Sequence, residues 1–175
     1  MLYGVISGVI GSKFPGPGVL QYKQEMMFQY PTFTGVDVRV KMGLLAADET
    51  SATLSTNVYL PDDHLACAGT ASVILPGTLN QFPGVDPAMS PVYESEAQQH
   101  KGMRIGQSIE ITRSYTSADI REYANLTGDT NPVYLDECFA QSIGLKGTII
   151  PAPLMSGIFS WILGTKLPGR GTNWM

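Results

Sequence analysis

The same fifteen-residue pattern stands near both ends of the chain. GVISGVIGSKFPGPG occupies residues 4–18 and GIFSWILGTKLPGRG occupies residues 157–171, at an offset of 153. Seven of the fifteen positions are identical without a gap, and most of the others are apolar in both copies. A self-match at fixed spacing marks a repeated structural unit. We therefore expect the two ends to occupy equivalent places in neighbouring repeats, in a chain that holds about one repeat plus a duplicated edge.

Each copy contains a predicted helix. Leu2 to Gly11 and Leu154 to Gly164 are apolar on nearly all sides, which is typical of a helix buried on most of its faces. Each helix is expected to stop at a Lys that is followed by an apolar residue and a Pro-Gly-x-Gly break.

The segment from Val19 to Leu75 changes to strand periodicity. Apolar residues alternate with charged ones from Val36 to Leu44, and the period of two continues from Leu54 to Leu60. Pro61 to His64 is typical of a hairpin turn, after which a return strand runs from Leu65 to Leu75. These patterns predict an antiparallel sheet.

The remainder divides into a connector and a second structured part. Pro76 to Arg104 carries four prolines and no periodicity, so we expect it to cross between parts of the fold. Ile105 to Tyr115 is a candidate strand, and Thr116 opens a helix that Gly128 closes, with Asp119 as the capping-box partner of Thr116. We predict three segments that together form one unit: residues 1–76, the connector 77–104, and residues 105–175.

Composition excludes several classes of protein. The chain has 175 residues, a net charge of −4 and a pI near 5.0, which argues against a nucleic-acid or anionic membrane surface. Its apolar opening segment is shorter than the roughly 20 residues that span a bilayer. Cys67 and Cys138 lack metal-ligand spacing, so we expect two buried free thiols, no metal site and a reducing, cytoplasmic location.

The segment GDTNPVYLDE, residues 128–137, allows a structural and a chemical interpretation. In the structural one, Asp129 is a turn residue, Asn131 is an N-cap, and Pro132 begins a helix that ends near Gly144. In the chemical one, the same side chains line an active site.

Several spaced motifs favour the chemical interpretation. YANLTGDTNPVYLDECFAQSIGLKGTIIPAPLMSGIFSWILGTKLPG resembles the MaoC-type (R)-specific enoyl-CoA hydratase and dehydratase family, with its aromatic-Ala helix, Gly-Asp-x-Asn-Pro turn and central helix. PGPGVLQYKQEMMFQYPTFTGVDVRVKMGLL resembles the linker and strands that follow that helix. The resemblance covers nearly everything except the connector. It implies an α+β hotdog fold, in which an antiparallel sheet wraps around a long apolar helix.

The order of the segments differs from that of an ordinary family member, which runs from a strand through helices and the central helix to the remaining strands. The chain is therefore expected to be either a circular permutant or a frame from a tandem double hotdog. Its surplus apolar helix is expected to pack within the chain, as in a double hotdog, or against a partner chain, and we expect a homodimer or higher oligomer.

The resemblance also implies a ligand and a set of site residues. Family members of this kind act on acyl thioesters of coenzyme A or acyl carrier protein and need no cofactor. The positions of Asp129 and Tyr134 would activate water, Asn131 would orient them, and the N–H of Ala152 would receive charge from the thioester oxygen. Gly128 and Ser156 complete the predicted substrate-binding residues.

The chain departs from the family pattern at the catalytic His, which is Tyr134 here. A Tyr pKa of about 10, against about 6.5 for His, makes it a poor base at neutral pH. His64 and His100 are expected at the surface, and Pro151 and Pro153 remove N–H donors beside Ala152.

These departures leave three hypotheses open. The first is a hydratase or dehydratase type of protein with degenerate catalysis. The second is a non-catalytic acyl-thioester-binding or structural module. The third is a hotdog thioesterase that uses Ser156 or Ser160.

Overall fold

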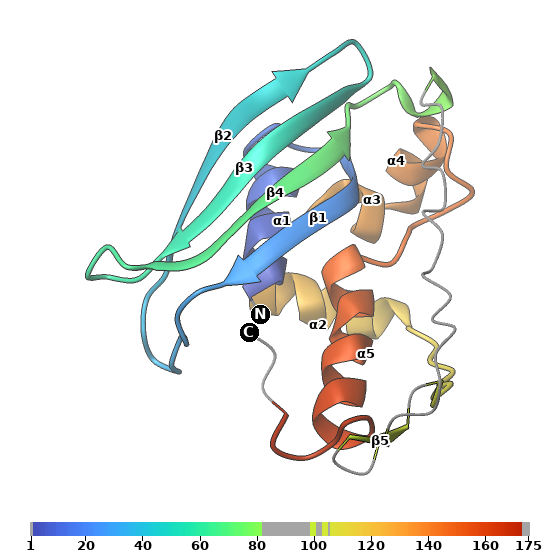
Figure 1. Ribbon diagram of the computed structural model, residues 1–175. Coiled ribbons are helices and arrows are strands. Elements are labelled where there is room, and N and C mark those ends of the chain that lie inside the picture. Colours follow the sequence, from blue (N-terminus) through green and yellow to red (C-terminus); the bar gives the residue numbers. More distant parts are fainter. Residues whose placement is uncertain (1, 82–98, 101–102, 105, 173–175) are drawn as a thin grey trace.

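A computed structural model describes residues 2–81, 99–100, 103–104 and 106–172, as drawn in Figure 1. Most of the predicted connector, with the side chain of His100, lies outside the described residues. The described part of the connector has a short 3₁₀ turn at Leu79–Gln81 and a two-stranded ribbon of β5 (Gln99–His100) and β6 (Met103–Arg104).

Four antiparallel strands form the main sheet. They are β1 (Leu20–Phe28), β2 (Arg39–Ala47), β3 (Ser51–Tyr59) and β4 (Leu65–Ile74), in the spatial order β1-β4-β3-β2. Burial alternates strictly along β3, because successive side chains of a strand point to opposite faces of the sheet. The predicted antiparallel sheet and return strand are confirmed, although β2 begins at Arg39 rather than at Val36.

The helix that packs on the sheet is the N-terminal copy, α1 (Leu2–Ser12). Ile6 and Ile10 are 0% and 2% exposed, and they pack in one cluster with Leu54, Val58 and Val73 of the sheet. Full burial of each such side chain stabilises the fold by about 1.5–3 kcal/mol. The sheet therefore covers an apolar helix from one end of the chain, as expected, but this helix has 11 residues, and a long central helix is not confirmed.

The second helix copy lies apart from the sheet. It is α5 (Ala152–Thr165), and none of its residues is buried. Figure 1 shows α5 standing below the sheet, while α1 lies behind it. The linkers that follow the two helices share their backbone: Gly16 and Gly18 have φ of 115° and 89°, and Gly169 and Gly171 have φ of 106° and 86°. The sequence repeat is therefore also a repeat of local structure.

Capping residues fix the helix before the GDTNP turn. α2 (Ser117–Thr127) starts at Thr116, whose side chain forms the predicted capping box with Asp119, and it ends at Gly128 in the left-handed conformation, with φ of 72°. The strand predicted from Ile105 to Tyr115 is wrong, because residues 106–115 are irregular and pair with no strand. The hydroxyl of Tyr115 instead donates to the Leu154 carbonyl oxygen at 3.1 Å, which holds this segment beside α5.

The helix predicted from Pro132 to Gly144 is divided in two. α3 (Pro132–Leu135) and α4 (Glu137–Ser142) are separated by Asp136, which is extended and accepts a hydrogen bond from the Phe139 N–H. The side chain of Asp136 caps α4, and its backbone is extended rather than helical. The first helix, α3, therefore ends at the residue before it.

Both cysteines are free, but only Cys67 is buried, so the prediction of a buried Cys138 is wrong. In the described part of the chain, no helix has the length and hydropathy needed to cross a bilayer. No group of three or more His, Cys, Asp or Glu side chains suited to a metal ion occurs among those residues.

Candidate active site and ligand cavity

Asp129 lies at the centre of a buried polar cluster. Its side chain is 0% exposed, and its Oδ2 atom accepts hydrogen bonds from the Ser7 hydroxyl at 2.7 Å and from the Tyr123 hydroxyl at 2.9 Å. Burial raises the pKa of Asp129, while these two hydrogen bonds lower it. The carboxylate is therefore enclosed by donors from α1 and α2.

Tyr134 belongs to the same cluster. Its side chain is 6% exposed. Burial raises the pKa of Tyr134 above its usual value, the charge of Asp129 raises it further, and a hydrogen bond with Ser7 lowers it. The phenol is thus held in its neutral form beside Asp129 and cannot serve as a general base near neutral pH.

Asn131 connects the GDTNP turn to the linker between α1 and β1. Its Oδ1 accepts a hydrogen bond from the Gly18 N–H at 3.2 Å, and its Nδ2 donates to the Val19 carbonyl oxygen at 3.0 Å. The same Oδ1 caps α3 by accepting from the Val133 N–H. The side chain is 1% exposed, so all of its contacts are with the protein interior.

Three glycines allow α1 to lie directly on the turn. A Cβ atom at Gly4 would stand 2.5 Å from Thr127 Cγ2, one at Gly8 would stand 3.0 Å from the Thr127 carbonyl oxygen, and one at Gly11 would stand 2.7 Å from Asn131 Cβ. These distances leave no room for a side chain. The helix α1 therefore packs directly against the polar cluster around Asp129 and helps to bury it.

The remaining predicted residues surround the start of α5. Pro151 is its N-cap and makes no side-chain cap hydrogen bond, and the N–H groups of Leu154 and Met155 both donate to the Pro151 carbonyl oxygen. Ala152 and Tyr134 line the same cavity of about 470 Å³. Gly128 caps α2 and lines neither this cavity nor the larger one.

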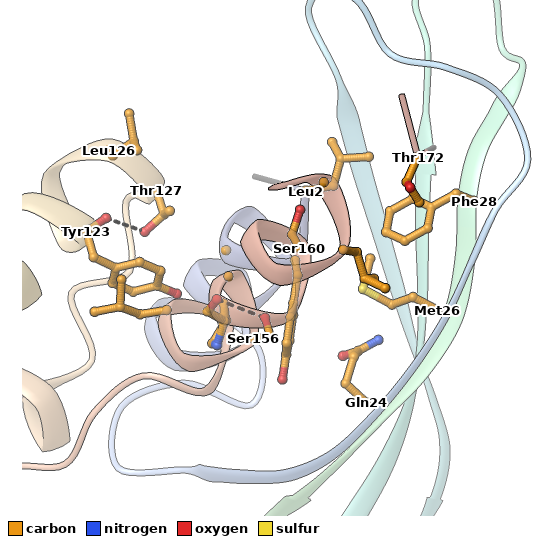
Figure 2. Close-up of a pocket in the computed structure, with 17 residues that line it drawn as sticks. Leu2, Gln24, Met26, Phe28, Tyr123, Leu126, Thr127, Ser156, Ser160 and Thr172 are labelled. Atoms are coloured by element: carbon orange, nitrogen blue, oxygen red, sulfur yellow. Dashed lines mark hydrogen bonds between the residues drawn. The ribbon is translucent and has the colours of Figure 1, made fainter. Parts of the chain in front are cut away.

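A larger cavity, of about 850 Å³, lies between α1, β1, α2 and α5. Its walls are mostly apolar and include Leu2, Met26, Phe28 and Leu163. Figure 2 shows Met26 and Phe28 of β1 on one side of this space and Ser156 and Ser160 of α5 on the other. Ser156 also lines the cavity, and its hydroxyl donates to the Pro153 carbonyl oxygen at 2.8 Å.

The structure thus separates the predicted site residues into groups. Asp129 and Tyr134 meet around Ser7, Ala152 shares the smaller cavity with Tyr134, and Ser156 lines the larger cavity. His64 is exposed in its hairpin turn, where its Nδ1 lies 2.8 Å from Asp62 Oδ2, as expected for a surface residue.

Sequence reasoning missed two members of the polar cluster, Ser7 and Tyr123. Ser7 is one of the identical positions of the repeat, and Tyr123 is the aromatic residue of the aromatic-Ala helix. The repeat identity at Ser7 and the aromatic-Ala motif at Tyr123 were both visible in the sequence, but neither pattern indicated a contact with Asp129.

An antiparallel sheet over a helix, with the GDTNP turn and further helices at its side, defines an α+β protein of the hotdog type. The model of the MaoC-like domain family matches residues 96–170. The predicted resemblance to MaoC-like hydratases and dehydratases is therefore confirmed for this part of the chain.

Individual relatives agree with this match. The chain is 39% identical over 66 residues to an (R)-specific enoyl-CoA hydratase of Rhodospirillum rubrum, covering 38% of this chain and 46% of the relative. It is 29% identical over 75 residues to an (R)-specific enoyl-CoA hydratase of Aeromonas caviae, covering 43% of this chain and 56% of the relative. The chain thus spans about half the length of the curated relatives that it matches.

Solved structures extend the similarity of fold beyond the matched segment. A MaoC-like dehydratase superposes with a TM-score of 0.59 at 14% identity, over 90% of this chain and 59% of that protein. HtdX of Mycobacterium tuberculosis superposes with a TM-score of 0.54 at 20% identity, over 90% of this chain and 60% of that protein. The permuted order, the three-segment division and the homodimer remain predictions.

Proposed function

We propose that this chain is an acyl-thioester-binding module of the hydratase and dehydratase type, in which the Asp129 site does not turn over substrate. Its ligand is an acyl group carried on coenzyme A or on acyl carrier protein. The relatives support this class of ligand, because they include enoyl-CoA hydratases and a mitochondrial 3-hydroxyacyl-[acyl-carrier-protein] dehydratase of Solanum lycopersicum.

The observation that carries the proposal is the enclosure of Asp129. General acid–base catalysis requires the carboxylate to come within about 2.6–3.2 Å of the proton that it transfers. Here Oδ2 is already bonded to Ser7 and Tyr123, and the side chain is 0% exposed. Tyr134 adds no base, because its pKa is raised. The cluster thus serves to dock α1, and binding falls to the apolar cavity.

The larger cavity has the size and lining that an acyl chain requires. Ligand pockets commonly have volumes of about 300–1,000 Å³ and are mostly apolar, with a few polar groups that fix orientation. The cavity of about 850 Å³ offers Leu2, Met26 and Leu163 as apolar wall and the hydroxyl of Ser160 as a polar group.

Thermal melting with octanoyl-CoA tests binding, because this saturated thioester cannot be hydrated. At 100 times the Kd, a ligand stabilises the folded state by about 2.7 kcal/mol, which corresponds to about 5–10 °C for a chain of this size. Free coenzyme A serves as the ligand control. A melting temperature that octanoyl-CoA leaves unchanged up to millimolar concentration would contradict the proposal.

A substitution inside the cavity locates the binding site. Gly157 lines the cavity, and a Cβ atom there would meet nothing within 4 Å, so Gly157→Leu fills ligand space without a clash. We expect this variant to fold and to lose most of the stabilisation by octanoyl-CoA. Thr165→Leu, on the same helix and outside the cavity lining, is the matched control and should retain the stabilisation.

Catalysis is the second candidate, and the smaller cavity favours it. Tyr134 and Ala152 line this cavity together, so a thioester there would meet a phenolic proton donor and a helix start. Loss of enoyl absorbance from crotonyl-CoA measures hydration. Turnover by the wild type that Asp129→Asn abolishes would establish an enzyme and overturn the binding proposal. Hydration gained only by Tyr134→His would show that the His alone is missing.

A further inference from the structure

Gln21 of β1 carries a buried hydrogen-bond acceptor that has no partner among the described residues. Its Oε1 atom is one of two buried side-chain atoms in that part of the chain without a hydrogen bond, and the other, Thr32 Oγ1, lines neither cavity. An unpaired buried acceptor costs free energy, so its presence in a folded protein requires a reason. Gln21 lines the smaller cavity together with Tyr134 and Ala152. The unpaired oxygen therefore belongs to a side chain that borders space for a ligand.

Neighbouring groups fix which end of the Gln21 amide is unpaired. The amide nitrogen of Gln24 donates to the Glu25 carbonyl oxygen at 2.9 Å and to the Thr56 hydroxyl oxygen at 3.1 Å. A carbonyl oxygen can only accept, so Gln24 must turn its nitrogen toward Glu25 and its own Oε1 toward Gln21. The Gln21 nitrogen donates to this Oε1 at 2.6 Å. The unpaired atom is therefore the oxygen of Gln21, and it requires a donor.

A β-bulge in β1 brings the two amides to the same side of the strand. Between Gln21 and Lys23, β1 advances by two residues while its partner β4 advances by one. In a regular strand, side chains three positions apart point to opposite faces of the sheet. The extra residue of the bulge lets Gln21 and Gln24 share one face, as their hydrogen bond requires. Bulges redirect side chains in this way next to active sites.

We propose that Gln21 Oε1 accepts a hydrogen bond from the ligand in the smaller cavity, and that it thereby selects ligands with a donor at this place. The inference rests on the proposed function, because it concerns the same acyl thioesters. Oε1 is covered in the structure, so the ligand must turn the terminal amide toward the cavity, and this torsion has a broad energy minimum. A donor that pairs with Oε1 removes the cost of the unpaired acceptor, and this gain adds to the affinity.

Two groups of an acyl thioester can supply the donor. One is a hydroxyl on the acyl chain, and the other is the amide N–H of the carrier arm nearest to the thioester sulfur. The cavity of about 470 Å³ has the volume of a common ligand pocket, and Ile149, Ile150 and Met155 form an apolar part of its wall. In such a pocket, a few polar groups fix the orientation of the ligand.

Two pairs of ligands, titrated by calorimetry, test the proposal and separate the two donors. (R)-3-Hydroxyoctanoyl-CoA and octanoyl-CoA differ in the hydroxyl. Octanoyl-CoA and its analogue methylated at the amide nitrogen nearest to the sulfur differ in the N–H. We expect the wild type to bind the member with the donor about three to ten times more tightly in one pair, which is the effect of one neutral hydrogen bond. A preference in the first pair identifies the hydroxyl, and a preference in the second identifies the amide.

Substitution of Gln21 should remove that preference. Gln21→Met and Gln21→Leu both replace the amide by an apolar group of similar size, and one folded variant of the two is sufficient. We expect the two members of the discriminating pair to bind this variant equally. Gln29→Met is the matched control and should keep the preference of the wild type, because Gln29 is exposed and lines neither cavity.

The outcomes separate this inference from the proposed function. Equal binding within both pairs by the wild type overturns the inference without any variant. A preference that persists in the Gln21 variants also overturns it, even if all ligands bind more weakly, because the side chain then has a packing role only. If no thioester binds to the wild type, the proposed function fails and this inference fails with it. Binding without discrimination overturns this inference alone.

Discussion

Alanine at Gly11 and at its repeat equivalent Gly164 should change stability in opposite directions. Both residues lie one position before the end of their helices, α1 and α5. In either helix, replacing Gly by Ala removes backbone freedom from the unfolded chain, which stabilises the helix by about 0.5–1 kcal/mol. The local effect of the substitution is thus the same at both sites, and only the surroundings differ.

The surroundings decide the sign at Gly11. A Cβ atom there would stand 2.7 Å from Asn131 Cβ and 3.0 Å from Asn131 Nδ2, and hydrogen bonds to Gly18 and Val19 fix this side chain. Overpacking of this kind costs about 1–3 kcal/mol. The gain of about 0.5–1 kcal/mol from replacing Gly in the helix offsets only part of this overpacking cost. We therefore expect Gly11→Ala to lower the free energy of unfolding by about 1–2 kcal/mol.

At Gly164 a Cβ atom would meet nothing within 4 Å, so Gly164→Ala should raise the free energy of unfolding by about 0.5–1 kcal/mol. Urea titrations followed by circular dichroism, together with thermal melts, measure both variants. A change of 1 kcal/mol corresponds to about 2–4 °C in a chain of this size. Equal stability of the two variants, or a stabilised Gly11→Ala, would refute the docking of α1 on the GDTNP turn.

Three further predictions use the same titrations. Asn131→Ala should cost about 2–5 kcal/mol, because it leaves the Gly18 N–H and the Val19 carbonyl oxygen buried without partners; a cost below 1 kcal/mol would contradict this role. Folding raises the pKa of Asp129 above its value of about 4 in the unfolded chain. As the pH rises from about 4 through the folded pKa, the free energy of unfolding of the wild type should therefore fall relative to that of Asp129→Asn. A difference between the two that does not change with pH would refute the raised pKa. Ile6→Ala should cost about 2–5 kcal/mol, while Phe159→Ala should stay within about 0.5 kcal/mol, and similar losses at both would show that α5 is covered.

Local signals in the sequence predicted most of the secondary structure. Thr116, Asp119 and Gly128 predicted both ends of α2, because capping depends on residues within one helical turn. The alternation along β3 predicted a strand with one buried face, since that pattern repeats with the pleat. The irregular segment 106–115 and the break at Asp136 were not predicted, because both depend on which neighbours are available for pairing or capping.

The sequence predicted the residue types of the candidate site from a motif, but it did not predict the contacts around them. Asp129, Asn131 and Tyr134 were identified from their motif, and the missing His was visible as Tyr134. The enclosure of Asp129 by Ser7 could not be predicted, since these residues lie 122 positions apart. Contact between segments so distant along the chain is decided by tertiary packing, which periodicity and caps do not report.

The repeat shows most clearly what the sequence alone determined and what required the tertiary structure. The sequence determined that both ends form an apolar helix followed by a Pro-Gly-x-Gly linker, because helix formation and glycine conformation are local properties. Only the tertiary structure decided that Ile6 lies under the sheet while Phe159 stays exposed, and that Ser7 bonds to Asp129 while Ser160 lines a cavity. The physical reason is that burial of either helix depends on contacts with segments far away in the chain, and only α1 packs on the sheet.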